Sequence, residues 1–267
     1  MKDSPMLPTI SVITACRNCA QTLEQAIASV ANQNGVQALH HIVDGGSTDS
    51  SLAIIKSSPD INDFLTEPDN GLYDAMNKGI QLAKGEVVGI LNADDFYSSP
   101  LVLQQVAHVF QDESVAACYG DLCYVSGEYS RKIVRYWRSG PYVYRKFYWG
   151  WMPPHPTFFV RRRIYERYGG FNLSLGSAAD YELMLRFLLK YQIKTAYIPE
   201  VLVCMRIGGV SNASLANRIK ANRMDRKAWL INGLRPYPWT LWCKPLRKLH
   251  QYFLRPSHVP IAISDAC

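Results

Sequence analysis

The chain has 267 residues, 48% of them hydrophobic, which is enough to fill a sizeable core in one large domain or in one domain with an appendage. No apolar run reaches the roughly eighteen residues that a transmembrane helix requires, and residues 1–13 lack a signal-peptide pattern, so we expect a cytoplasmic globular protein. The net charge of +7 is concentrated near the C-terminus, because residues 213–256 hold ten Lys or Arg and only one acid, Asp225.

Short apolar runs alternate with helical patterns in the first part of the chain. Strands are predicted at residues 9–14, up to Asp44, at 63–67 and at 86–91, and helices at 22–30, 48–55 and 72–80. Thr22 and Gln25 have the spacing of a capping box, and Thr48 or Asp49 is expected to cap the second helix. Continuous apolar runs indicate a parallel sheet that helices cover on both faces, and ligands bind at the carboxyl ends of such strands.

The pattern loosens after about residue 112. Residues 115–127 predict one or two strands, residues 133–160 are rich in Tyr, Trp and Pro, and residues 177–191 predict a helix. A strand near residues 195–198 and a turn at 206–212 follow. From about Asn212 a polar helix and an aromatic, basic tail are expected.

Asp94 and Asp95 follow a buried strand in "VVGILNADDFY". Two adjacent carboxylates repel each other, so a cation between them and an anionic ligand would make the pair tolerable. Oxygen ligands of this kind suit Mg²⁺ or Mn²⁺, which use one or two carboxylates together with substrate phosphates. The alternative is a solvated turn in which Asp95 caps the next helix.

Asp44 ends a predicted strand in "VDGGSTD", where Gly45 and Gly46 allow a sharp turn or a close approach to a ligand. Its carboxylate could accept a hydrogen bond from a base or a ribose, and the alternative is a turn before a helix. No G-x-x-x-x-G-K-[ST] or G-x-G-x-x-G motif occurs, which disfavours a nucleoside triphosphatase or an ordinary dinucleotide fold. Cys16 and Cys19 form a lone C-x-x-C, for which reduced thiols are favoured over redox or zinc chemistry.

Several ordered motifs match a known family. These are "SVITACRN", "VDGGSTDSS", "EPDNGLYDAMNKGIQLAKGEVVGILNADD", "HPTFFVRRRIYERYGGFN" and "AADYELMLR". Together they resemble the family 2 glycosyltransferases with the GT-A fold, close to bacterial enzymes of exopolysaccharide and lipopolysaccharide synthesis, over roughly residues 8–212. The resemblance implies an α/β domain at 1–212 with a mostly parallel central sheet flanked by helices. Its nucleotide-binding half would span about 1–112 and its acceptor half about 113–212, followed by a helical, basic and aromatic extension at 213–267.

The resemblance also implies a nucleotide-sugar donor, with UDP as the favoured nucleotide. Asp44 would accept from the imide of uracil, beside Thr14. The other implied donor-binding residues are Ala15, Arg17, Asp69, Asn70, Lys78, Asn92, Ala93 and Asp94. Asn92 departs from the acidic first position of the family's D-x-D motif, so the resemblance leaves the metal, Mg²⁺ or Mn²⁺, on Asp94 or Asp95.

Asp180 matches the catalytic base of the family, although Ala179 stands where the family has Glu. The implied reaction is an inverting single displacement, in which a carboxylate takes the proton of the acceptor hydroxyl. The divalent ion would neutralise the charge that develops on the departing diphosphate. By position alone, Asp180 would instead be a helix N-cap.

The acceptor site is the less specific part of the resemblance. His155 stands where related enzymes often carry a histidine near the acceptor, and Trp149 and Trp151 are candidates for stacking on sugar rings. The alternative is a loop that simply packs over the sheet. Residues 206–212 resemble a loop that closes on the diphosphate through Arg206 and backbone N–H groups.

Six aromatic residues accompany the basic charges of residues 213–256, a composition that an anionic membrane surface would fit. The resemblance, and not the charge, favours this partner, on the inner face of the cytoplasmic membrane, because such enzymes commonly extend glycans on a polyprenyl diphosphate lipid. Nucleic acid is the competing partner and is not expected, and a solvated helix pair remains open. We therefore expect a metal-dependent glycosyltransferase that extends a glycan or a polyprenyl-linked glycan in surface polysaccharide synthesis. The alternatives are a non-catalytic nucleotide-sugar-binding or scaffold subunit and, less favoured, a nucleotidyltransferase.

Overall fold

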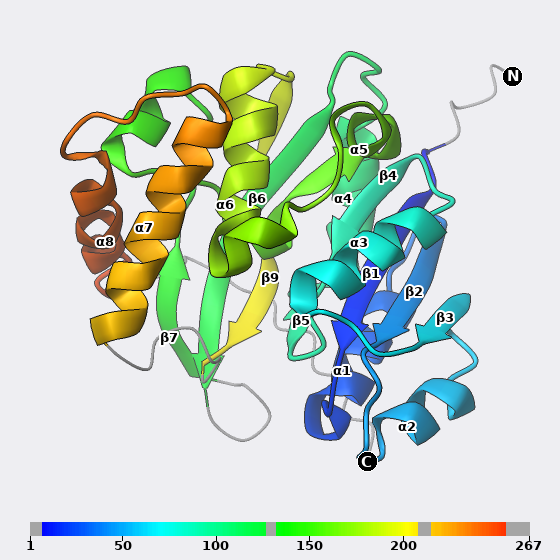
Figure 1. Ribbon diagram of the computed structural model, residues 1–267. Coiled ribbons are helices and arrows are strands. Elements are labelled where there is room, and N and C mark those ends of the chain that lie inside the picture. The colour runs from blue at the N-terminus through cyan, green and yellow to red at the C-terminus, as the bar shows by residue number, and fades with distance from the viewer. Residues whose placement is uncertain (1–6, 127–131, 208–214, 255–267) are drawn as a thin grey trace, which may run out of the picture.

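A computed structural model describes residues 7–126, 132–207 and 215–254, with the backbone alone for residues 215–220 and His250 (Figure 1). A single nine-stranded sheet runs through the molecule, with helices packed on it. None of the helices in these ranges is long and apolar enough to cross a membrane.

The first part of the chain forms the expected parallel strands. They are β1 (Ile10–Cys16), β2 (Ala38–Asp44), β3 (Asp63–Thr66) and β4 (Val87–Ile90), in the order β3-β2-β1-β4. Every residue of β1 and β4 is buried, as the continuous apolar runs predicted. The helices between these strands are α1 (Ala20–Ala31), α2 (Ser51–Ser57) and α3 (Leu72–Leu82).

The second part of the chain makes the sheet mixed. The strands β5 (Asp95–Tyr97), β6 (Ala117–Ser126), β7 (Lys132–Trp137), β8 (Phe159–Arg161) and β9 (Thr195–Arg206) complete it, in the order β4-β8-β6-β9-β5 with β7 on β6. Only β6 and β9 pair in parallel there, and the other pairings are antiparallel. The prediction of a mostly parallel sheet therefore holds for the first four strands, and one strand, β6, forms where one or two were predicted.

Helices of the second part surround this mixed sheet. The α-helices are α4 (Val102–Val109), α5 (Arg162–Tyr168), α6 (Ala179–Met184), α7 (Leu215–Ile231) and α8 (Thr240–Leu249). Short helical turns are η2 (Tyr144–Trp149), η3 (His155–Thr157), η4 (Leu173–Ala178) and η7 (His250–Tyr252), and α6 continues as the π-helical η5 (Leu185–Lys190). The predicted helix at 177–191 is confirmed, and its residues Tyr181, Met184, Leu185 and Leu188 are all buried.

The predicted capping box at Thr22 and Gln25 is wrong. Helix α1 begins at Ala20, with Cys19 at the N-cap position and no side-chain cap of its own. Asp49 takes over this role, because its carboxylate accepts from the backbone N–H of Ala20 at 3.1 Å and from that of Ser51 at 2.9 Å. A residue far along the chain therefore satisfies the start of α1, which local spacing could not indicate.

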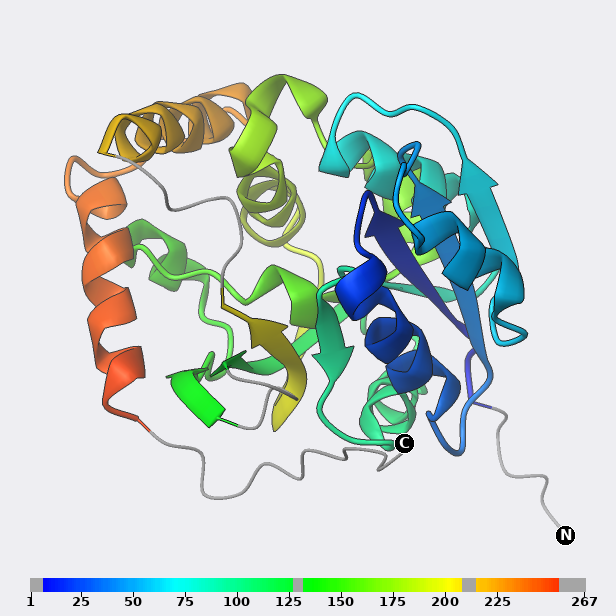
Figure 2. The same ribbon diagram turned by 90° about the horizontal axis from the view of Figure 1, so that it is seen from below.

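The C-terminal helices pack on the second half of the sheet domain and lie on the opposite side of the molecule from α1 and α2 (Figure 2). Trp229 of α7 is fully buried, and its indole N–H donates to the hydroxyl of Tyr181 in α6 at 2.9 Å. Asn232 donates to Glu182 at 3.0 Å. The extension that begins near residue 213 thus shares a core with α6.

Candidate active site

Thr14 and Asp44 lie at the carboxyl ends of β1 and β2, as expected, and both are fully buried. The hydroxyl of Thr14 is 2.9 Å from Nε2 of His40. Both carboxylate oxygens of Asp44 accept from the backbone N–H of Ser47 at 3.2 Å, and one accepts from the Ser47 hydroxyl. Asp44 therefore does hold a turn, with acceptor capacity left on each oxygen.

The loop after β3 lies against this turn. A Cβ atom added to Gly45 would come within 2.0 Å of Oδ2 of Asp69, so the absence of a side chain at Gly45 makes room for Asp69. The other oxygen of Asp69 accepts from the N–H of Gly71 at 2.9 Å. Asp69 thereby links the carboxyl end of β2 to the first turn of α3.

Asn70 and Lys78 belong to the same loop. The N–H of Asn70 donates to Asp74 at 2.9 Å. The Lys78 ammonium lies 2.7 Å from Glu67 and 3.0 Å from the carbonyl of Pro68, so it clamps the loop to α3. Of the remaining donor-side residues, Ala15 is buried in β1 and Arg17 is exposed just beyond that strand.

Asp94 and Asp95 have different surroundings. Asp95 is fully buried as the first residue of β5, and its Oδ2 accepts from the Asn92 amide at 2.9 Å. Burial, and after it the charge of Asp94, raise the pKa of Asp95 to about 8. Asp94 is half-buried, and Ala93 between the two polar positions is buried. The alternative in which Asp95 caps a helix is wrong, because the residue begins a strand.

Arg206, the last residue of β9, lies beside this acidic pair. Its guanidinium donates to the backbone carbonyl of Asp94 at 2.7 Å and to the side chain of Gln25, and it lies 5.5 Å from the ring centroid of Phe96. Residues 208–212 of the predicted closing loop lie outside the described residues. The positive charge of Arg206 and the raised pKa of Asp95 both reduce the repulsion that the sequence predicted here.

Asp94, Asp95 and Asn92 could hold a divalent ion if a bound ligand supplied the remaining oxygen atoms. Among the described residues, no three His, Cys, Asp or Glu side chains converge on one metal position. Asp94 offers a half-buried carboxylate, and Oδ1 of Asp95 and Oδ1 of Asn92 are buried without a hydrogen-bond partner in the same part of the chain. One or two carboxylates completed by phosphate oxygens is the ligand set that Mg²⁺ commonly takes.

Asp180 lies in the first turn of α6, on the other side of the site. Its Oδ1 accepts from the N–H of Tyr181 at 2.7 Å, and its Oδ2 is 3.3 Å from Nδ1 of His155. The prediction of an N-cap is wrong, since Ala178 occupies that position and Asp180 is two residues further on. Asp180 and His155 line a cavity of ≈ 20 Å³, room for about one water molecule.

Two residues of α3, Tyr73 and Asn77, also lie on this side of the site, although the sequence did not single them out. Burial raises the pKa of the Tyr73 phenol, and the charge of Asp180 together with a hydrogen bond to it raises that pKa further. Asn77 exchanges two hydrogen bonds with the backbone of Phe171, at 2.7 and 2.9 Å. Their motif, "NGLYDAMNKG", was part of the family resemblance, but without a role for either residue.

An ion pair holds the chain that leads into α6. Glu182 is 2% exposed and pairs with Arg186 at 3.0 Å. Arg186 also donates to three successive carbonyls, those of Tyr168, Gly169 and Gly170. Together with the Asn77 contacts, this network fixes the position of Asp180 relative to α3.

Neither Trp149 nor Trp151 offers a stacking surface beside Asp180. Trp151 is 5% exposed, donates to the carbonyl of Ser139 at 2.9 Å and packs edge-on against Tyr119 and Phe147, so it has no free face for a sugar. The prediction for Trp151 is therefore wrong, and the packing alternative is right. Trp149 is 51% exposed but lies against Trp239 and α8, away from the cavity that Asp180 lines.

Comparison with known proteins places these features in a family. The family model for glycosyl transferase family 2 matches residues 11–169. An uncharacterized glycosyltransferase of Mycobacterium tuberculosis is 34% identical over 188 residues, which cover 68% of this chain and 70% of that protein. A PGL/p-HBAD biosynthesis glycosyltransferase of Mycobacterium bovis is 29% identical over 211 residues, or 77% of this chain and 80% of that protein.

Solved structures agree on the fold. S. aureus TarS 1-349 in complex with UDP-GlcNAc has a TM-score of 0.65 at 18% identity, over 83% of this chain and 66% of that one, so the chain spans just under two thirds of it. The mannosyltransferase PcManGT from Pyrobaculum calidifontis, in complex with GDP-Man and Mn²⁺, has a TM-score of 0.62 at 18% identity, over 90% of this chain and 73% of that one. The fold is that of the GT-A glycosyltransferases, and the expected architecture is confirmed. With a family match over more than half of its length, the chain belongs to glycosyl transferase family 2 and is a glycosyltransferase.

Proposed function

We propose that the protein transfers a sugar from a nucleotide-sugar donor, with UDP as the nucleotide, to a hydroxyl of a glycan or a polyprenyl-linked glycan, with inversion. One observation carries this proposal. The segment from Asp69 to Lys78 contacts both sides of the site, because Asp69 lies against the turn at Gly45 and Tyr73 lies beside Asp180. A donor bound at the ends of β2 and β4 would therefore present its sugar near Asp180.

The chemistry follows from the position of Asp180. Its carboxylate takes the proton of the acceptor hydroxyl, the acceptor oxygen forms a bond to the anomeric carbon, and the bond from that carbon to the diphosphate oxygen breaks. The nucleoside diphosphate leaves with the bonding electron pair. His155, 3.3 Å from Asp180, helps to hold the carboxylate in place.

Asp94 would supply the accessible carboxylate for a divalent ion, Mg²⁺ or Mn²⁺, and Asp95 is the second candidate ligand, although it is buried. When bound, the ion offsets the negative charge that develops on the diphosphate. Arg206 adds a fixed positive charge at the same place. The Mn²⁺ in the PcManGT complex supports this choice of cofactor by analogy.

The biological setting is proposed from the relatives. A similar protein acts in PGL/p-HBAD biosynthesis, and chondroitin synthase of Pasteurella multocida is 25% identical over 184 residues, which are only 19% of that protein. Both names fit the synthesis of a surface polysaccharide or glycolipid. Membership of glycosyl transferase family 2 favours an enzyme over the scaffold alternative.

The decisive experiment is a panel of UDP-, GDP-, dTDP- and CMP-sugars tested by thermal shift with Mn²⁺, Mg²⁺ or a chelator. A ligand that binds the folded protein raises its apparent stability, so we expect a metal-dependent shift with a UDP-sugar. Release of UDP with a glycan acceptor, lost in Asp180→Asn, would then establish transfer. A shift with none of these donors at any metal concentration would overturn the proposal.

A further inference from the structure

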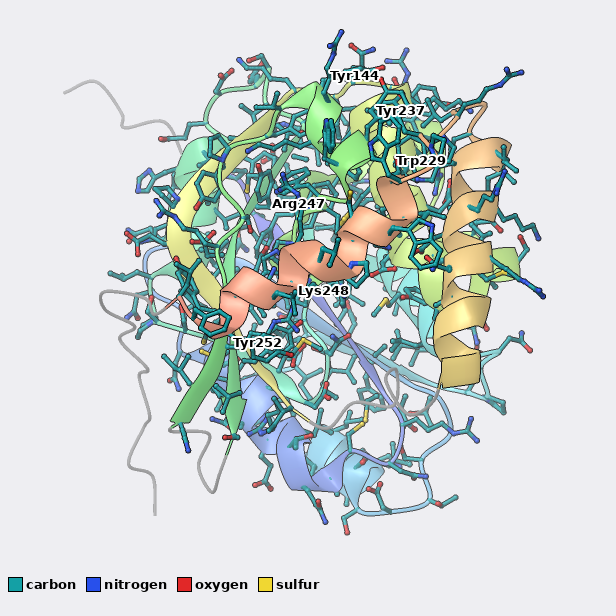
Figure 3. All side chains as sticks on the ribbon, turned by 90° about the vertical axis from the view of Figure 1, so that its left-hand side faces the viewer. Tyr144, Trp229, Tyr237, Arg247, Lys248 and Tyr252 are labelled. Atoms are coloured by element: carbon teal, nitrogen blue, oxygen red, sulfur yellow. The ribbon has the colours of Figure 1, made fainter. Side chains whose placement is uncertain are left out.

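Helix α8 has its apolar side turned outward. Trp242, Leu246 and Leu249 follow the spacing of one helical face, and they are 71%, 63% and 58% exposed. Phe253, just beyond the helix, is 86% exposed. A surface helix of a globular protein normally buries such a stripe. Helix α8 crosses the face of the molecule that Figure 3 shows.

The polar side of α8 is the one that packs on the protein. Thr240 is fully buried and donates to the carbonyl of Tyr148 at 2.7 Å. Lys244 pairs with Asp225 of α7 at 2.6 Å, with both side chains 15% exposed or less, and its ammonium lies 3.5 Å from the ring centroid of Tyr181. Rolling the helix to bury its apolar stripe would break this ion pair and leave Asp225 buried alone, which is costly.

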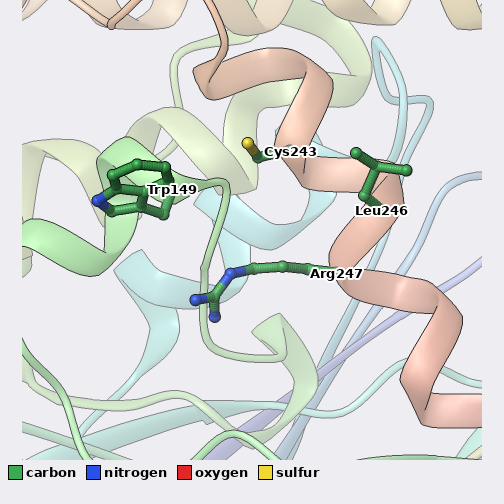
Figure 4. Close-up of a pocket in the computed structure, with 4 residues that line it drawn as sticks. All are labelled: Trp149, Cys243, Leu246 and Arg247. Atoms are coloured by element: carbon green, nitrogen blue, oxygen red, sulfur yellow. The ribbon is translucent and has the colours of Figure 1, made fainter.

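Aromatic residues extend the stripe beyond α8. Trp149 of η2 and Trp239 lie with ring centroids 5.9 Å apart, and Tyr237 is 5.1 Å from Trp239. A groove of ≈ 520 Å³ between η2 and α8 is lined by Trp149, Cys243, Leu246 and Arg247 (Figure 4). We name Trp149, Trp239, Trp242, Leu246, Leu249 and Phe253 the α8 face.

The exposed charged side chains on α8 and on the neighbouring segments are basic. Arg247 of α8, Arg145 of η2 and Arg235 before α8 are exposed, and the sequence has no Asp or Glu between Arg226 and Ser264. The acid that contacts α8, Asp225, is buried and paired with Lys244. Basic side chains around an apolar strip with Trp and Tyr match a helix that lies in the headgroup region of an anionic bilayer. Two copies of the face would bring these like charges together, which disfavours self-association.

We propose that the α8 face docks on a phospholipid bilayer that contains anionic lipids, with α8 lying along the surface. The ten residues of α8 are too short to span a bilayer, so the helix enters only the headgroup and upper acyl region. Docking would hold the active site beside a lipid-linked acceptor. This consequence rests on the proposed function. Membrane binding itself requires no sugar transfer.

The test is flotation of the purified protein with vesicles of phosphatidylcholine alone or with about one third phosphatidylglycerol. We expect binding to the anionic vesicles, weakened at least about tenfold in the triple variant Trp242→Ser, Leu246→Ser, Leu249→Ser, because three apolar side chains no longer enter the bilayer. The matched control, Phe64→Ser with Leu101→Ser, changes residues that are 45% and 47% exposed elsewhere and should bind like the wild type.

A second variant, Arg235→Glu with Arg247→Glu, changes two exposed side chains, keeps the apolar stripe and should lose the preference for anionic vesicles. It carries the test should the triple variant fail to fold. Wild-type protein that ignores anionic vesicles, or that forms a dimer which the triple variant disrupts, would overturn the proposal in favour of a protein partner. Donor binding by thermal shift should be unchanged in both variants, which separates this result from a failure of the proposed function.

Discussion

The Asp180 carboxylate lies 3.3 Å from Nδ1 of His155, although Asp180 belongs to the first turn of α6 and His155 begins η3. The other carboxylate oxygen of Asp180 accepts a hydrogen bond from the N–H of Tyr181, so contacts on two sides fix the orientation of the carboxylate. Tyr73 closes the same small cavity from α3. The Asp180 carboxylate is therefore 15% exposed, and its fixed orientation leaves one direction from which an acceptor hydroxyl can approach it.

Asp180→Asn should abolish sugar transfer while the protein still binds its donor. General-base catalysis is typically worth a factor of about 100 to 10,000, so we expect a loss of kcat in that range with little change in the donor Kd. The measurement is nucleoside diphosphate release with acceptor, together with calorimetry of donor binding. Equal loss of binding and turnover would assign Asp180 a structural role. His155→Gln should lower kcat less, because the carboxylate remains.

Asp94→Asn should remove the metal dependence of donor binding. The amide is a poorer ligand for Mg²⁺ or Mn²⁺, so the extra thermal stabilisation that Mn²⁺ gives to the donor complex should fall by most of its value. Asp60→Asn, at an exposed position of the same half, is the matched control and should behave like the wild type. An unchanged response to Mn²⁺ in Asp94→Asn would place the ion elsewhere.

Because of Asp95, the free energy of unfolding of the ligand-free protein should fall as the pH rises. Its folded pKa is about 8 and its ordinary value is 3.8, so between these values the folded state holds a proton that the unfolded chain has released. Stability therefore falls as the pH rises through this window, and the total is on the order of a few kcal/mol. In Asp95→Asn this loss should disappear.

Urea unfolding at several pH values between about 5 and 8, without metal or nucleotide, measures this difference. Asp60→Asn should follow the wild-type curve in parallel, since that side chain is exposed. Parallel curves for the wild type and Asp95→Asn would show that Asp95 is ionised in the folded protein at neutral pH.

Gly45→Ala should weaken donor binding by moving Asp69. The new methyl group would lie 2.0 Å from Oδ2 of Asp69, and the flexible carboxylate is the group that can move. We expect donor affinity to fall by roughly tenfold with a loss of unfolding free energy of only about 1 kcal/mol. A double-mutant cycle with Asp69→Ala checks the cause. If Gly45→Ala costs as much affinity in the Asp69→Ala background as alone, Asp69 is not the reason.

The sequence by itself determined the strands and helices of the first half and the acidic residues at the strand ends. Continuous apolar runs and helical spacing are local signals, and the strands that they predicted at β1, β2, β3 and β4 are all present. The resemblance in the ordered motifs also led to the correct family. These features depend on which residues must be buried, and the local order of apolar and polar residues indicates which those are.

The tertiary structure alone decided what each polar group meets. Pairing of β5 with β9 buries Asp95 and places Arg206 beside it, and Asp49 caps α1 from another segment. It also buried Trp151 and turned the apolar side of α8 outward. The physical reason is that a pKa, a hydrogen bond or a free aromatic face depends on neighbours distant in the sequence, and only the packed sheet and helices bring those neighbours together.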